Sequence, residues 1–134
     1  MPVTFYALES GRILYVRIVS PWTVDDLIAT YPLQKPYFDQ ASGRVHSLYD
    51  MLEMRAIPKT PLRGRFSPGL FHKSSGYVVV VGANSSPARM LTDLSFRLMG
   101  KTDYRYATSF ESGLAFLKRE IAVEHDLSMI YQSL

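Results

Sequence analysis

The first twenty residues carry the apolar pattern of two β-strands. Val3 to Leu8 and Arg12 to Val19 are rich in β-branched and aromatic residues, and the break at Glu9-Ser10-Gly11 is short enough for a hairpin. One face of the second segment is fully apolar, whereas the other ends in the charged Arg17. The chain is therefore predicted to open with an antiparallel hairpin whose second strand is half exposed.

Capping residues and prolines predict where the first helix begins and ends. Thr23, with Asp26 three positions further on, has the form of a capping box, so a helix is expected to start there. Pro32 and Pro36 each remove an amide donor. This helix is therefore expected to kink or restart before Gln40.

Three later segments have helical signals of different strength. Ser86 as cap, Pro87 at the first helical position and Gly100 beyond the end bracket a helix over 87–99. Between residues 60 and 72, glycines and prolines interrupt the helical spacing, which predicts one short helix or two pieces hinged at Pro68. Ser109 caps the last helix, and its expected buried stripe is Phe110, Leu114, Leu117 and Ile121.

Three further segments are predicted to be strands: Arg44 to Met51, Tyr77 to Val81 and Tyr104 to Thr108. The second is an unbroken β-branched run, which is typical of a strand covered on both faces, and we expect it at the centre of the sheet. The element order is β-β-α-β-α-β-α-β-α. Because helices connect the later strands, this order predicts an α/β sandwich with a mixed, mainly parallel sheet.

Composition narrows the class of protein. With 134 residues, of which 47% are hydrophobic, the chain suffices for one domain, assigned to 1–124, with 125–134 as an extension of the last helix. The net charge of +3 is too small to indicate a nucleic-acid partner. The absence of cysteine excludes disulfides, thiolate zinc sites and iron–sulfur clusters. No apolar run approaches the length of a membrane-spanning helix, so a soluble, cytoplasmic protein is expected.

Three stretches of this order resemble the STAS domain of anti-sigma factor antagonists, and most closely their SpoIIAA-like relatives. They are Arg44 to Asp50 with Ile57-Pro58, Gly76 to Gly82, and Thr108 to Leu117, and the likeness covers roughly residues 3–120. The resemblance implies a STAS-like fold, a regulatory role and, for the SpoIIAA-like group, an association with lipids or other hydrophobic ligands. Where the phosphorylated antagonists have their acceptor serine, this chain has Lys59, so a phosphorylation switch of that kind is not expected.

Few residues suggest chemistry. Asp50 and Glu53 follow the third strand, at the edge of the sheet where α/β proteins bind ligands, but such carboxylates more often accept backbone hydrogen bonds or pair with arginine. Asn84 and Ser85, in a loop entering a helix, are either turn residues or contacts for a phosphate or headgroup. The histidines have no metal-ligand spacing, and no nucleophile motif is present. A non-enzymatic protein without a cofactor is therefore expected, and an enzyme using the two carboxylates is a distant alternative.

The middle of the chain is electropositive. No acidic residue occurs from Met54 to Thr92, whereas six are basic. This stretch is either a solvated surface or a segment that gates a hydrophobic pocket for a lipid or other anionic amphiphile. If the segment gates such a pocket, the headgroup contacts are Arg63, Arg65 and Lys73, and the mouth of the pocket is lined by Phe66, Leu70 and Phe71.

The last helix carries a second apolar row. With Leu117 at the centre of the buried face, Phe116, Val123, Leu127 and Ile130 fall on the outward side, and Phe96 is likewise expected to lie off the buried face of its own helix. Either the tail bends after Glu124 and packs on its own domain, or the row is a surface for a homodimer or another protein partner. The leading hypothesis is an interaction module, and lipid binding is the alternative.

Overall fold

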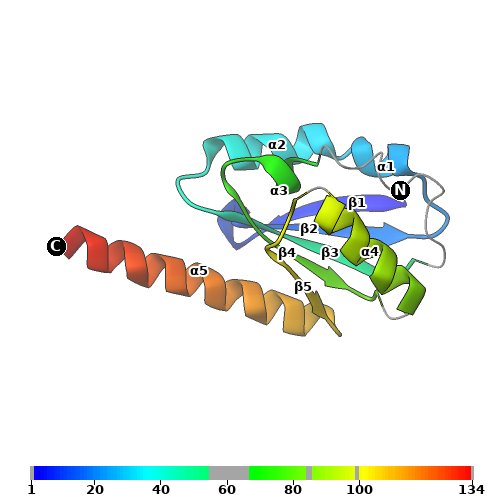
Figure 1. Ribbon diagram of the computed structural model, residues 1–134. Coiled ribbons are helices and arrows are strands. Elements are labelled where there is room, and N and C mark those ends of the chain that lie inside the picture. The colour runs from blue at the N-terminus through cyan, green and yellow to red at the C-terminus, as the bar shows by residue number, and fades with distance from the viewer. Residues whose placement is uncertain (1, 55–66, 84–85, 99, 134) are drawn as a thin grey trace.

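A five-stranded sheet organises the computed structural model, which describes residues 2–54, 67–83, 86–98 and 100–133 (Figure 1). The strands are β1 (Val3–Leu8), β2 (Ile13–Val19), β3 (Val45–Glu53), β4 (Ser75–Val81) and β5 (Tyr104–Ala107). They lie side by side in chain order, with β1 antiparallel to β2 and every other neighbouring pair parallel. The predicted α/β fold with a mixed, mainly parallel sheet is confirmed.

The centre of the sheet is β3, not β4 as the sequence pattern predicted. The pattern identified β4 correctly as covered on both faces, because Val78 to Val81 are all buried. Only β5 follows β4 in the sheet, however, so β4 lies one strand away from the middle. Burial on both faces follows from the helices that cover a strand, and it does not locate the strand within the order.

In the described residues the strands are connected by η1 (Glu9–Gly11), α1 (Val24–Ile28), α2 (Tyr31–Gln40), α3 (Pro68–Phe71) and α4 (Ser86–Leu98), and α5 (Phe110–Ser133) follows the last strand. The capping box at the start of α1 is present, with Asp26 N donating to Thr23 Oγ1 at 3.2 Å and Thr23 N donating to Asp26 Oδ2 at 2.7 Å. The first helix ends at Ile28 and a new one begins at Tyr31, which confirms the restart expected from the prolines.

The two faces of the sheet are covered unequally (Figure 1). Helices α1 to α4 lie over one face, where the core includes Val16, Val80 and Phe96. Of the described helices, α5 alone lies over the other face, where it packs Leu117 against Leu48 and Val79. One helix is too narrow to cover five strands, so both flanks of α5 leave sheet surface that other groups must fill.

Helix α5 packs closely on the sheet through its first turns. Ser109 caps it, since its Oγ accepts from Ser112 N at 3.1 Å, and the predicted buried stripe around Leu117 is confirmed. At Gly113 an added Cβ would lie 2.9 Å from Leu48 Cδ1, so the absence of a side chain permits the close approach. The helix then continues without a break to Ser133 and its end projects beyond the sheet (Figure 1). The alternative in which the tail bends after Glu124 is therefore wrong.

Candidate functional site: a pocket beside the edge strand

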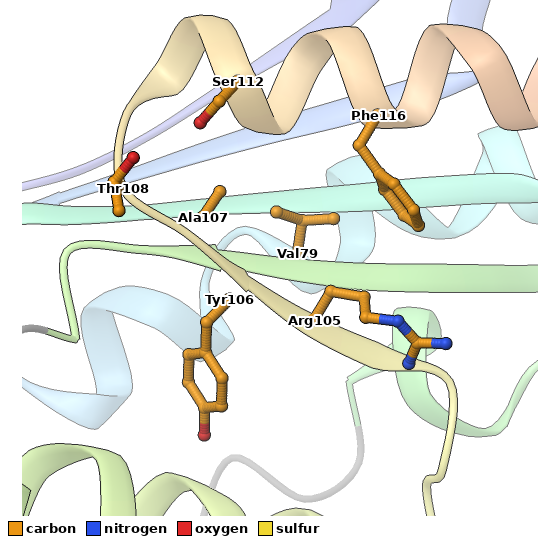
Figure 2. A pocket seen from close by; sticks show the side chains of 7 residues that line it. All are labelled: Val79, Arg105, Tyr106, Ala107, Thr108, Ser112 and Phe116. Carbon is orange, nitrogen blue, oxygen red and sulfur yellow. The ribbon is translucent and has the colours of Figure 1, made fainter.

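A pocket of about 310 Å³ lies between the first turns of α5 and strands β4 and β5 (Figure 2). Its apolar walls are Val79, Ala107 and Phe116, and its polar groups are Arg105, Thr108 and Ser112. Figure 2 shows Arg105 and Phe116 at one end and Thr108 and Ser112 at the other. The pocket exists because α5 covers β4 but not all of β5, and because Ala107 is too small to fill the remaining space.

The guanidinium of Arg105 is the charged group of this pocket. Its Nη1 donates to the carbonyl oxygen of Tyr104 at 2.8 Å, and its Cζ lies 5.2 Å from the centroid of the Tyr77 ring, within cation–π range. The ring of Phe116 meets Tyr77 edge-on, with centroids 5.2 Å apart. In the part of the chain that the structure describes, no carboxylate lies within 4.0 Å of the Arg105 guanidinium. Arg105 is thus oriented by aromatic and backbone groups, and its charge is available.

The pocket opens beside a strand whose outer edge has no neighbouring strand among the described residues. The amide of Val78 donates to the carbonyl of Asp103 at 2.9 Å, which sets the alternation of the parallel ladder. Arg105 and Ala107 therefore direct their backbone groups toward β4, and Tyr104 and Tyr106 direct theirs outward. The Tyr104 N–H donates to the Thr102 carbonyl oxygen at 3.0 Å and its own carbonyl accepts from Arg105, so the free backbone groups beside the pocket are those of Tyr106.

A buried polar cluster holds α5 at the opposite end of the sheet. Glu124 accepts from Arg12 Nη2 at 2.8 Å, and its Oε1 lies 4.0 Å from Arg44 Nε and 3.2 Å from His46 Nε2. His46 is fully buried, and its Nδ1 accepts from the Tyr77 amide at 2.9 Å. This cluster contains the last ion pairs between α5 and the domain among the described residues, and beyond it the helix projects.

The pKa values in this cluster shift because of burial. Burial, followed by the charges of Arg44, Arg12 and Lys101, lowers the pKa of His46 to about 4. Burial also raises the pKa of Glu124, although Arg12 and Arg44 oppose that shift. Glu124 attracts a proton toward His46, but its charge is already balanced by the two arginines. A proton on Nδ1 would face the Tyr77 N–H, so we assign His46 as neutral with its proton on Nε2.

The two carboxylates singled out in the sequence have structural partners. Asp50 Oδ2 accepts from the Tyr15 hydroxyl at 2.6 Å, and its Oδ1 accepts from the Leu52 amide at 3.1 Å. Glu53 pairs with Arg17 at 2.7 Å. Neither carboxylate lines the pocket. These contacts support a structural role for the two carboxylates.

The residues proposed to bind an amphiphile are only partly described. Arg63, Arg65, Phe66, Asn84 and Ser85 lie outside the described residues.

Of the remaining members of that set, Leu70 packs against the core that contains Val80, while Phe71 and Lys73 are exposed at the end of α3. Helix α3 covers the face opposite α5 (Figure 1), so these residues and the described pocket lie on different sides of the sheet.

The apolar row of α5 is largely exposed. Val123 and Leu127 are each 50% exposed and Ile130 is 55% exposed, as the helical spacing predicted. Phe116 differs from the prediction, because it is half-buried against Tyr77 on the β5 side of the helix. Phe116 forms one wall of the pocket, and the exposed row of α5 begins about two turns further along the helix, at Val123.

The expectation that Phe96 lies off the buried face of its helix is wrong. It is 8% exposed, belongs to the core and stacks on Tyr104 with ring centroids 4.6 Å apart. The exposed row of α4 is instead Met90, Leu94 and Leu98. Helix α4 carries apolar residues on more than one side, and periodicity does not show which side meets the sheet.

The sequence pattern did not predict the pocket. It places Arg105, Ala107 and Thr108 in the last strand and Ser112 in the last helix. Arg105 was the one available signal, since it is a charged residue within a short strand of aromatic and small residues. The space beside Ala107 depends on where α5 lies, which no local pattern shows.

Comparison with known proteins adds no family assignment, since neither a family model nor a curated protein matches this chain. Within the described ranges, no group of three or more histidine, aspartate or glutamate side chains is arranged to hold a metal ion. No helix in those ranges combines the length and the apolar character needed to cross a membrane.

Proposed function

We propose that this chain is a non-enzymatic interaction module that self-associates through α5. The observation that carries the proposal is the exposed row of Val123, Leu127 and Ile130 on a helix that continues beyond its last ion pair with the domain, at Glu124. Full burial of one such side chain contributes about 1.5–3 kcal/mol, so the row is a source of binding energy that the described residues leave unused.

The occupant of this surface is proposed to be a second copy of the same helix. The row advances by seven, four and three residues from Phe116, which is the spacing of a seam between two helices. Residues 125–134 contain one aspartate and no lysine or arginine, so two copies meet with little repulsion. The projection of the helix past the sheet leaves room for a partner helix alongside it (Figure 1).

A regulatory role without catalysis agrees with the remaining contacts. Asp50 and Glu53, the carboxylates at the end of β3, are hydrogen-bonded or ion-paired. The resemblance of the chain to anti-sigma factor antagonists supports a signalling module, and Lys59 at the acceptor position argues that its interactions are not controlled by phosphorylation there.

Light scattering across a concentration series tests the proposal. The wild-type chain should show twice the chain mass of 15.2 kDa at high concentration. Leu127→Asp should weaken the dimer by on the order of 100-fold, because a two-fold interface loses the burial of two leucines. Ser128→Asp introduces the same charge one residue away, at an outer position of the helix pair, and should leave the dimer intact. A wild-type chain that stays monomeric at millimolar concentration contradicts the proposal, as does equal weakening by both variants.

A further inference from the structure

The outer edge of β5 offers unpaired backbone groups to an incoming strand. Tyr106 directs its N–H and C=O away from β4, and nothing described pairs with that edge as a strand. The carbonyl of Tyr104 is covered by the side chain of its own neighbour, Arg105. An exposed edge of this kind binds extended peptides through main-chain hydrogen bonds, and adjoining pockets then select the side chains.

The pocket lies where alternate side chains of such a peptide point. A residue directly opposite Arg105 places its Cβ about 5 Å from that of Arg105, on the α5 face of the sheet. The next residue on this face lies two positions along, opposite Ala107, whose small side chain leaves the pocket space beside Phe116. The volume of about 310 Å³ is at the lower end of ligand-binding pockets and suits one or two side chains.

The charged side chains around β5 determine which kind of peptide the strand edge would bind. Arg105 has no carboxylate partner among the described residues, and on the other face of β5 the Arg89 guanidinium lies 4.3 Å from the Tyr106 ring centroid. Asp103 pairs with Arg44 at 3.1 Å, whereas Asp93 accepts from the neutral Tyr106 hydroxyl at 2.6 Å and keeps its negative charge beside Arg89. The cationic group of the strand edge is therefore Arg105, on the α5 face.

From these observations we infer that β5 docks an extended acidic peptide as a sixth strand. An aspartate or glutamate lies opposite Arg105, and a large apolar residue two positions away enters the pocket beside Ala107 and Phe116. Docking releases the Arg105 guanidinium from the Tyr104 carbonyl. The guanidinium then donates to the carboxylate of the peptide, and the Tyr104 carbonyl accepts from a backbone N–H of the peptide. The inference rests on the proposed function in treating the chain as an interaction module, but it uses a different surface from the α5 extension.

The probe is a capped heptapeptide of threonine and valine with glutamate at its third position and leucine at its fifth. Amide spectra of the Leu127→Asp chain are recorded during titration, so that self-association does not enter the measurement. We expect shifts concentrated in residues 104–108. Arg105→Glu should weaken binding by about tenfold, because one charge-assisted contact is replaced by repulsion. A peptide with lysine in place of glutamate should regain the lost affinity on that variant.

Two controls separate strand addition from other binding. Lys118→Glu changes the net charge equally on the other flank of α5, where Lys118 pairs with Glu9 at 3.3 Å, and should leave affinity within about twofold of the parent. A peptide N-methylated on the amides that face β5 should lose binding, because its edge can no longer donate hydrogen bonds.

Three results overturn the inference. They are no shift in residues 104–108 at millimolar peptide, equal weakening by Arg105→Glu and Lys118→Glu, and undiminished binding of the N-methylated peptide. The last result would show that the peptide binds through its side chains, without main-chain hydrogen bonds to β5. Failure of self-association is recognised separately, as a monomeric wild-type mass in light scattering.

Discussion

Lowering the pH from 7 to 4.5 is expected to destabilise this fold through one buried side chain, His46. Its ring is fully buried, and its Nδ1 accepts a hydrogen bond from the Tyr77 amide at 2.9 Å. Protonation of Nδ1 would break that bond and add a positive charge close to Arg12 and Arg44. These contacts account for a folded-state pKa of about 4, well below the value of about 6.5 for an exposed histidine.

The sign and size of the effect follow from proton linkage. Between pH 6.5 and 4 the unfolded chain binds a proton at this residue that the folded chain does not, so stability falls as the pH falls. A difference of 2.5 in pKa corresponds to about 3 kcal/mol in total, of which about 2 kcal/mol is lost by pH 4.5. The raised pKa of Glu124 acts in the opposite direction, because the folded chain takes up that proton first, and it offsets part of the loss near the acidic end.

Urea denaturation from pH 4.5 to 7 measures this dependence, and the His46→Gln variant provides the comparison. Glutamine retains an acceptor for the Tyr77 amide but does not titrate, so the variant should have a flatter profile between pH 4.5 and 6.5. NMR of the ring should show no protonation of His46 above pH 5. If the ring titrates near pH 6.5, or if wild type and variant lose stability in parallel, the assignment of His46 as a buried neutral group is refuted.

Two substitutions test packing. Gly113→Ala should lower the free energy of unfolding by about 1–2 kcal/mol, because the added Cβ would lie 2.9 Å from Leu48 Cδ1. This cost outweighs the preference of alanine for helices. A stabilised variant in thermal or urea unfolding would contradict the close packing of α5. Phe96→Ala should lower the free energy of unfolding by about 3–5 kcal/mol in the same assay and leave the oligomeric mass unchanged, because Phe96 lies in the core. A stable variant with an altered oligomeric mass would show instead that Phe96 belongs to an interface.

Local sequence signals accounted for the elements. The capping box at Thr23, Pro32 in the first turn of α2, and the β-branched run of β4 each depend on neighbours within a few residues. The order of strands and helices along the chain then implied parallel pairing, because a helix between two strands carries the chain back to the same end of the sheet. The fold class was predictable for that reason.

The buried sides of helices α4 and α5 were harder to predict from local sequence patterns. On α5 the row around Leu117 was identified correctly, because its apolar spacing is regular and begins directly after the cap at Ser109. On α4 the exposed Met90 row and the buried Phe96 are both apolar, and only contact with Tyr104 decides between them.

The candidate site itself depends entirely on tertiary structure. Its pocket exists because α5 crosses the sheet over β3 and β4, leaving Ala107 uncovered and Arg105 beside Tyr77. The sequence alone determined which segments are strands and helices and that the end of α5 is amphipathic, since these properties follow from local spacing. Only the packed structure decided which strand became the edge and where a cavity remained, because both depend on contacts between residues far apart in the chain.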